Sequence, residues 1–171
     1  DLAIGLSMLI GDYISTHRDD FVADLISIDT ALARAAAVPG PVCLLDMGDN
    51  VGGGSPADST HLLHALARTG LTSAFVCLFD PASVAQAAAA GIGSRLEMQV
   101  GGKTDAAHGK PFSGAFEVLG TYDGKFVESA PRHGGFTHCD QGQTAVVRAE
   151  SGLTVMLTSR RMPPFSLQQL I

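Results

Sequence analysis

The sequence contains no tryptophan, and only 6% of its residues are aromatic, so its interior must be built mainly from small and aliphatic side chains. Basic residues are also scarce, because 11 Lys and Arg stand against 17 Asp and Glu and give a formal net charge of -6. Nucleic-acid binding relies on clustered Lys and Arg, so we expect no nucleic acid among the partners. Arg160 and Arg161 form the one basic pair, which we place at a solvated strand end.

Cysteine and long apolar runs are sparse as well. The three cysteines, Cys43, Cys77 and Cys139, show no Cys-x-x-Cys spacing, which favours a reduced, cytoplasmic protein over a disulfide scaffold. The apolar opening, residues 2–10, is about half as long as a bilayer-spanning helix and has no basic residue before it. We therefore expect a buried segment there and no membrane association.

Hydrophobic material is plentiful. Apolar residues make up 46% and charged residues 16% of the 171 positions, which is enough for one globular domain and too little for two full ones. The chain starts at Asp1 rather than Met, and residues 166–170 have a helical pattern that stops at Ile171. These ends indicate one domain, residues 1–171, that is a piece of a longer protein.

The first two thirds of the chain alternate between helix and strand signals. Residues 1–40 are expected to be helical, with a helix over 19–38 that Pro39 and Gly40 terminate. Strand, helix, strand, helix, strand is the order expected over 41–110, and such an order predicts a parallel sheet with right-handed crossovers. The expected elements are strand 42–45, helix 59–69, strand 73–79, helix 81–90 and strand 95–100.

Residues 111–171 change to hairpin patterns. Asp123 and Gly124 separate strands expected over 112–120 and 125–129, and an Asp-Gly pair favours a tight hairpin. Ser151 and Gly152 separate strands 144–150 and 153–158 in the same way. The predicted fold class is therefore α/β, a mixed sheet with an N-terminal parallel β-α-β-α-β portion followed by antiparallel hairpins.

Three loops would follow the predicted parallel strands, and the loops at the carboxyl ends of such strands build the binding crevice of α/β proteins. They are residues 46–60, Asp80 with Pro81, and 101–110. The first loop is rich in glycine and opens a helix, so it could hold an anion or a substrate carboxylate. A tight turn capped by Asp49 and Asp58 explains the same residues equally well, and no Gly-Lys-Ser/Thr of a phosphate loop is present.

The third loop brings a cation, a carboxylate and an imidazole within six residues, as Lys103, Asp105 and His108. Such a set could stabilise charge or transfer a proton. The structural alternative is a polar loop with a salt-bridged lysine and a solvent-facing histidine.

Metal binding has weak support in the sequence. His61 and His64 are three apart on a predicted helix, a spacing that can hold a metal, but we expect them at the surface. Residues 133–140 include His133, His138 and Cys139 but lack the spaced pairs of a structural zinc site. No self-contained zinc hydrolase motif occurs.

Four motifs nevertheless occur in an order that resembles the C-terminal domain of the microcystinase C (MlrC) family. They are Gly48-Asp49-Asn50 followed by Gly52-Gly53-Gly54-Ser55-Pro56, then Gly101-Gly102-Lys103 with Asp105, then His108-Gly109-Lys110-Pro111, and finally Leu157-Thr158-Ser159-Arg160. The likeness covers the chain from about residue 17 onward. Two positions depart from the family pattern, Val51 in place of Pro and Ala57 in place of Gly, and both affect the first loop.

The resemblance implies a longer parent whose N-terminal domain carries the zinc of a metallopeptidase that acts on small peptides or amides. This chain would then bind no metal of its own, and its loops 48–60 and 101–110 would wall the active-site cleft beside that N-terminal domain. On this hypothesis, the candidate substrate-binding residues are Asp49, Asn50, Gly52, Gly53, Gly54 and Ser55. The candidate catalytic residues are Lys103, Asp105 and His108.

Two other functions stay open at this stage. The chain could be a structural or interaction module without activity, whose residues 2–10 pack on the missing part or on a second copy as a homo-oligomer. It could also be an independent anion-binding or nucleotide-binding domain, although the first loop contains no lysine.

Overall fold

The computed structural model describes residues 1–71, 73–132 and 134–170, and the chain divides into two compact units, Asp1–Val38 and Pro39–Ile171. The first unit contains helix α1 (Leu2–Thr16), a 3-10 turn (Arg18–Phe21) and helix α2 (Ile28–Ala36). Asp1 caps α1, and Ser27 caps α2 by accepting the Thr30 N–H at 3.2 Å.

The first unit differs from the sequence-based expectation in two ways. The helix predicted over 19–38 begins only at Ile28, because the Ser27 side chain takes up an amide of its first turn. Residues 2–10 are helical but not buried in this chain, since Leu2, Ile4 and Met8 are 79%, 60% and 65% exposed. Neither α1 nor any other helix in the described ranges is long and apolar enough to cross a membrane.

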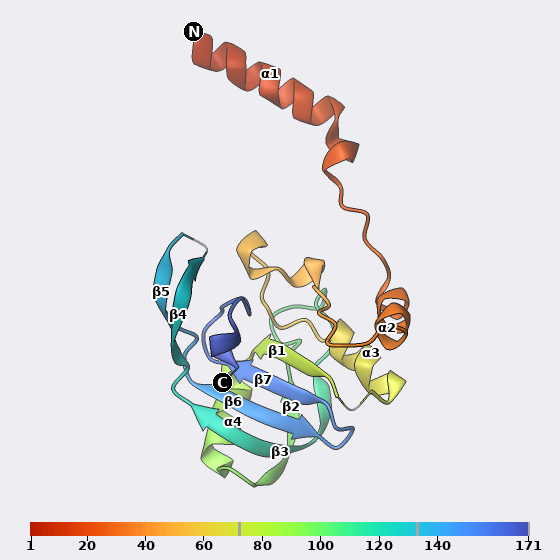
Figure 1. The fold of residues 1–171 in the computed structure, drawn as a ribbon, viewed down its shortest axis with the longest axis vertical. Helices are drawn as coiled ribbons and strands as arrows, with labels where there is room; N and C mark the ends of the chain where they lie inside the picture. Colours follow the sequence, from red (N-terminus) through yellow and green to blue (C-terminus); the bar gives the residue numbers. More distant parts are fainter. Residues whose placement is uncertain (72, 133, 171) are drawn as a thin grey trace. The chain divides into compact units, whose positions relative to one another are not determined.

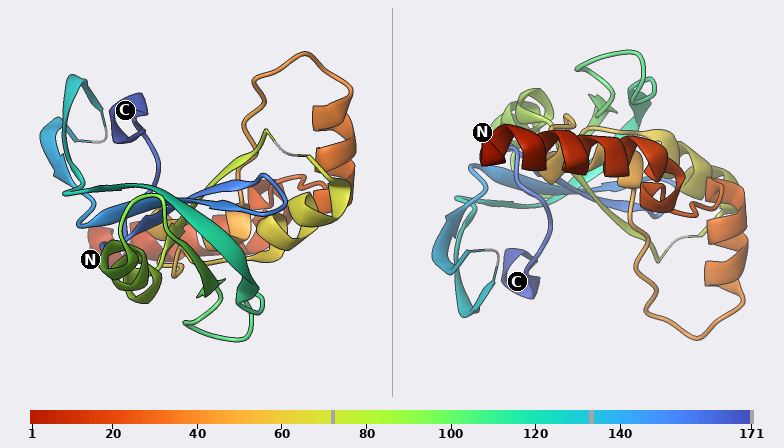
Figure 2. Two further views of the ribbon diagram at one scale, coloured as in Figure 1. Left: turned by 90° about the horizontal axis from the view of Figure 1, so that it is seen from below. Right: turned by 90° about the horizontal axis from the view of Figure 1, so that it is seen from above.

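The second unit is built on a mixed five-stranded sheet with the order β1-β7-β6-β3-β2 (Figure 1). Its strands are β1 (Phe75–Phe79), β2 (Arg95–Val100), β3 (Phe112–Tyr122), β6 (Thr144–Ala149) and β7 (Thr154–Thr158). β1 runs parallel to β7, and every other pair in this sheet is antiparallel. Strands β4 (Lys125–Arg132) and β5 (Phe136–Asp140) form a separate antiparallel pair that stands away from the sheet (Figure 2).

Helix α4 (Pro81–Ala90) connects β1 to β2 and packs against β2, β3, β6 and β7 (Figure 2). Asp80 caps its first turn, with Pro81 at the first helical position, and Gly91 ends it at φ 84°. Val84 and Ala87 of α4 are buried, as are Val155 and Leu157 of β7. Helix α3 (His61–Thr69) ends at Gly70 with φ 70°, as the glycine predicts.

The predicted parallel β-α-β-α-β portion was wrong, although the mixed α/β class is confirmed. Residues 42–45 form no strand, β1 pairs with β7 rather than with β2, and β2 pairs antiparallel with β3. The β2 sequence Arg-Leu-Glu-Met-Gln-Val alternates between polar and apolar residues, which is typical of an antiparallel strand with one wet face. The continuous apolar run of β1 instead pairs with β7, a strand in which four of the five residues are buried.

The two predicted hairpins had different outcomes. β6 and β7 pair directly around Ser151 and Gly152, with Val147 opposite Val155. β3 and β4 do not pair across Asp123 and Gly124, because β3 takes β6 as its partner and β4 takes β5. The Asp-Gly signal therefore marks a turn between two sheets rather than a hairpin within one.

Candidate functional site

The three loops predicted to form a crevice do converge, at the edge of the sheet where β1 ends. The Phe79 N–H donates to the Ala57 carbonyl oxygen at 2.7 Å, and the Gly102 N–H donates to the Asp58 carbonyl oxygen at 2.7 Å. The Gly101 N–H donates to Oδ2 of Asp80 at 2.9 Å. We call residues 46–60, Asp80 and residues 101–110 the loop cluster.

Two glycines allow this convergence although β2 lies at the opposite edge of the sheet from β1. Gly101 and Gly102 adopt φ 63° and 57°, the left-handed region that glycine enters without steric cost. A Cβ on Gly101 would lie 2.7 Å from Cγ2 of Thr60, and one on Gly102 would lie 2.8 Å from the backbone of Lys110. The turn after β2 therefore requires glycine for both its dihedral angles and its close packing.

Asp80 is the buried centre of the loop cluster, with its side chain only 1% exposed. It accepts the Ser83 N–H at 3.0 Å and both carboxylate oxygens accept from Nζ of Lys103, at 2.9 and 2.7 Å. Burial alone would raise the pKa of Asp80, but the hydrogen bonds from Lys103, Ser83 and Gly101 outweigh it and lower that pKa.

Lys103 is fully engaged by these contacts. Its third ammonium proton points to Oγ of Ser83 at 2.8 Å, so the three donors of the group all have acceptors. The lysine predicted as a catalytic candidate thus joins the third loop to the start of α4. Its side chain is 34% exposed, and the charge is neutralised by Asp80.

Asp58 makes a second buried junction that the sequence suggested only as a helix cap. One carboxylate oxygen, Oδ2, accepts the N–H groups of Lys103 and Thr104 at 2.8 and 2.9 Å and the Thr104 hydroxyl at 3.0 Å. The other oxygen, Oδ1, is buried without a hydrogen-bond partner in the described part of the chain. The first and third loops are therefore held together by a carboxylate that is 2% exposed.

The glycine-rich part of the first loop uses its own amides. Asn50 accepts the Gly52 N–H at its side chain and the Gly53 and Ser55 N–H groups at its carbonyl oxygen, while Gly54 donates to the carbonyl oxygen of Val51. Ser55 in turn donates its hydroxyl to the Gly48 carbonyl oxygen at 2.8 Å. Because these donors are occupied, the conformation favours the tight-turn interpretation over an anion cradle.

Asp49 fixes the strained end of the same loop. Its two carboxylate oxygens accept the N–H groups of Ala57 and Ser59 at 2.6 and 2.7 Å. Ala57 has φ 64°, a left-handed conformation that costs an L-residue roughly 1–2 kcal/mol. This is one of the two positions where the sequence departs from the family pattern, and glycine would adopt this φ freely.

Asp105 and His108 form an exposed ion pair on the third loop. Nδ1 of His108 lies 2.8 and 2.9 Å from the two carboxylate oxygens of Asp105, and Nε2 lies 4.0 Å from Oδ1 of Asp49. The hydrogen bond to Asp105 raises the pKa of His108, and the hydrogen bond to His108 lowers the pKa of Asp105. The side chains are 19% and 44% exposed, so the pair is accessible.

Helix α3 and the residue before it anchor the third loop. The anchoring side chains include His61 and His64, which the sequence predicted as surface histidines. Nε2 of His61 lies 2.9 Å from the Ala107 carbonyl oxygen, and Nε2 of His64 lies 3.0 Å from that of Lys110. Thr60 donates its hydroxyl to the same Lys110 oxygen at 2.7 Å. The i, i+3 spacing of the histidines was the available signal, and it marks a shared contact face rather than a metal site.

The donor groups of the described residues do not fit a zinc site. No group of three or more His, Cys, Asp and Glu side chains is placed to hold a metal ion within the described ranges. Nε2 of His61 and of His64 lies against a backbone carbonyl oxygen, and Nδ1 of His108 lies against Asp105. His133 lies outside the described residues, and His138 has the Thr137 hydroxyl at 3.1 Å from Nδ1.

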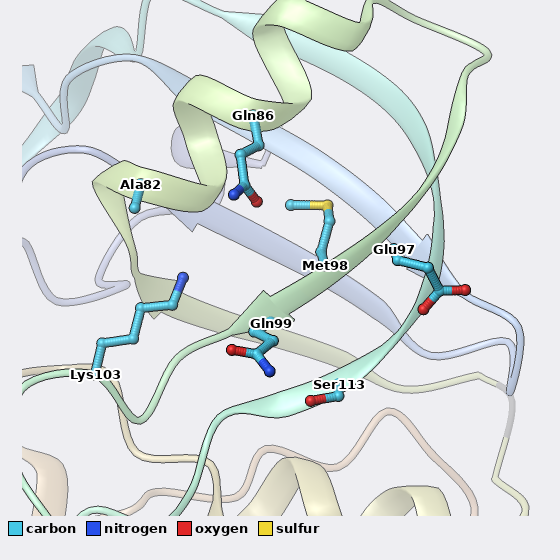
Figure 3. A pocket seen from close by; sticks show the side chains of 7 residues that line it. All are labelled: Ala82, Gln86, Glu97, Met98, Gln99, Lys103 and Ser113. Carbon is cyan, nitrogen blue, oxygen red and sulfur yellow. The ribbon is translucent and has the colours of Figure 1, made fainter.

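An open pocket of about 500 Å³ adjoins the loop cluster between α4 and the edge strand β2 (Figure 3). Lys103 reaches into its rim toward Ala82, in the first turn of α4. The remaining lining comes from Gln86, Glu97, Met98, Gln99 and Ser113. None of the other predicted site residues lines this pocket.

Comparisons with known proteins agree with the motif order. Residues 44–171 match the family described as MlrC C-terminus. Microcystinase C from Sphingomonas sp. is 34% identical over 93 residues, which are 54% of this chain and 18% of that protein. A crystal structure of a "Putative metallopeptidase" from Mesorhizobium sp. BNC1 superposes with a TM-score of 0.77 at 29% identity, covering 87% of this chain and 30% of the other.

The chain thus spans less than a third of the length of these two relatives. The family match includes all three loops of the cluster and the strands that carry them. This chain belongs to the MlrC C-terminal family.

Proposed function

We propose that this chain is the C-terminal domain of a zinc-dependent hydrolase that acts on small peptides or amides, and that its loop cluster walls the substrate cleft. The observation that carries the proposal is the convergence of three loops, cross-linked by the buried carboxylates of Asp58 and Asp80, at one edge of the sheet. Family membership and the names of the two relatives support the reaction class.

The zinc, on this proposal, is held by an N-terminal domain of a longer protein. The side chains described above do not fit a zinc site, and the two relatives extend well beyond the segment that they share with this chain. The partner of the loop cluster is then that metal-binding domain. The proposal places the whole protein in the cytoplasm.

The geometry divides the candidate residues into two groups. Lys103 and Asp49 act as positioning residues, because their polar atoms hold other parts of the loop cluster. Asn50, Gly52, Gly53, Gly54 and Ser55 present an outer surface of short turns for contact with a substrate, with Asn50 and the three glycines exposed. Asp105 and His108 form the accessible charged pair at the rim.

A second candidate function, an interaction module, is favoured by α1. This helix has no buried residue, and its apolar side chains Leu6, Leu9 and Ile10 are 51%, 67% and 55% exposed. A helix that is apolar on all sides is normally covered, here by the rest of a longer protein or by a second copy in a homo-oligomer.

Photo-cross-linking tests the location of the cleft. A short linear peptide carrying a benzophenone group would be irradiated with the longer protein, and the attached positions would be mapped by mass spectrometry. We expect attachment to residues 46–60 and 101–110, and none to the Ser151 and Gly152 turn. Attachment confined to residues outside this chain would remove the loop cluster from the cleft.

A further inference from the structure

Two adjacent arginines, Arg160 and Arg161, follow strand β7 and make different contacts. Arg160 donates from Nη1 to Oδ2 of Asp140 and forms a salt bridge with that carboxylate. Arg161 donates from Nε to the Pro56 carbonyl oxygen at 2.9 Å. Its guanidinium also lies over the ring of Phe79, with Cζ 4.9 Å from the ring centroid.

These contacts place Arg161 at the loop cluster. Phe79 is the last residue of β1 and lies opposite Thr158 of β7, and Pro56 belongs to the first loop. Because β1 and β7 are parallel, their carboxyl ends lie at one edge of the sheet, and Arg161 crosses that edge three residues after β7 ends. The guanidinium is therefore fixed beside the loops that we propose wall the cleft.

The guanidinium keeps most of its hydrogen-bonding capacity. Arginine has five N–H donors, and the contact with Pro56 uses the one on Nε. No carboxylate of the described residues forms an ion pair with Arg161, whereas Lys103, His108 and Arg160 each hold an aspartate. The side chain is exposed, so its Nη groups can be reached from solvent.

A guanidinium that is held at Nε and stacked on an aromatic ring is suited to bind a carboxylate. It presents two parallel N–H groups in a planar fork that matches the two oxygens of a carboxylate. Because the side chain is already ordered by Pro56 and Phe79, less conformational entropy is lost when a ligand binds.

We propose that Arg161 binds a carboxylate of the substrate, so that the substrate class is small peptides with a free carboxyl group. The identification of the ligand as a peptide rests on the proposed function. The carboxylate could be the C-terminus of the peptide or an acidic side chain, and both offer the same two oxygens to the guanidinium.

A binding experiment on the 171-residue chain tests this inference without requiring hydrolysis. The arginine Nε–Hε signals would be followed by NMR during titration with N-acetyl-Ala-Ala, its C-terminal amide, and N-acetyl-Asp-amide. We expect the acid to shift the Arg161 signal and to bind about tenfold or more tightly than the amide, as the loss of charge-assisted hydrogen bonds implies. N-acetyl-Asp-amide carries only a side-chain carboxylate, so a weaker response than that of the acid assigns the recognised group to the C-terminus, and a stronger response assigns it to a side chain.

Arg161→Gln should abolish the preference for the acid, while Arg160→Gln, the matched control, should retain it. Arg161→Lys keeps the charge but loses the planar fork, so we expect an intermediate affinity, and an unchanged amide spectrum verifies that each variant is folded. Equal binding of the acid and the amide, or an acid preference that survives in Arg161→Gln, would overturn the inference. Acid binding at Arg161 in a protein that hydrolyses no peptide would contradict the proposed function alone.

Discussion

The third loop takes part in two acid–base pairs, one with Asp80 and one within the loop, that differ in burial and therefore in role. The Lys103–Asp80 pair has a carboxylate that is 1% exposed and surrounded by donors from the lysine, Ser83 and Gly101. The His108–Asp105 pair lies at the rim, where the carboxylate is 44% exposed. Residue type alone made Lys103, Asp105 and His108 catalytic candidates, but the burial of each carboxylate separates a structural junction from an accessible pair.

Removing the buried carboxylate should have the largest effect. Asp80→Ala leaves the Lys103 ammonium and two backbone N–H groups without their acceptor, so the free energy of unfolding should fall by about 3 kcal/mol. Urea denaturation measures it. The matched control, Asp105→Ala, loses only solvent-exposed hydrogen bonds and should lower the urea midpoint much less. Equal losses in the two variants would contradict the distinction.

A second comparison uses two glycines of the loop cluster. Gly102→Ala places a Cβ 2.8 Å from backbone atoms at φ 57°, so the stability should fall by about 2 kcal/mol or more. Gly53 has nothing within 4 Å of an added Cβ, so Gly53→Ala should have little effect. Thermal unfolding of both variants tests this, and a larger loss at Gly53 would place the rigid part of the cluster in the first loop.

Ala57→Gly should stabilise the protein by up to about 1 kcal/mol. The substitution relieves an alanine at φ 64°, and the greater freedom of glycine in the unfolded chain offsets part of the gain. Ala85→Gly, on the exposed side of α4, is the control and should cost about 1 kcal/mol. Destabilisation by both substitutions in a urea titration would show that the Ala57 conformation carries no strain.

The exposed His108–Asp105 pair should affect the titration of His108 more than it affects global stability. The pKa of His108 is raised above its usual value of 6.5, so its contact with Asp105 stabilises the folded state fully below pH 6.5. This contribution is lost as the pH rises through the raised pKa. The pKa of Asp105 is lowered below its usual value of 3.8, so its contribution to stability is present above pH 3.8 and is lost as the pH falls through the lowered pKa. The contact is therefore strongest at mildly acidic pH.

NMR titration of the His108 ring measures this coupling directly. The midpoint should lie above 6.5 in the unaltered chain and return toward that value in Asp105→Asn. A midpoint that does not change in Asp105→Asn would mean that another group controls the histidine.

The sequence predicted the positions of helices and strands better than it predicted which strands pair. Helix 81–90 and strand 95–100 match α4 and β2, because Asp80, Pro81 and Gly91 mark the helix ends and the strand has a clear alternation. The pairing of β1 with β7 joins segments that are far apart in the chain, and no local signal encodes such a contact. Residues 42–45 were predicted as a strand from their apolar run alone, and they form none.

The site was predictable as a meeting of loops but not as a set of contacts. The three loops converge as expected, yet the reason is the left-handed turn at Gly101 and Gly102 rather than a parallel strand. The role of Asp58 depends on Lys103 and Thr104, which lie 45 and 46 positions away, and Arg161 depends on Pro56, which lies 105 positions away. Such contacts exist only after the sheet has formed.

This chain is proposed to shape a cleft whose zinc is bound elsewhere in a longer protein. Elemental analysis of zinc and hydrolysis of a small linear peptide, measured side by side on the 171-residue chain and on the longer protein, test it most directly. We expect zinc and hydrolysis in the longer protein and neither in the 171-residue chain. Stoichiometric zinc in the 171-residue chain would contradict it, and His108, His133 and His138 would then be the first ligands to replace.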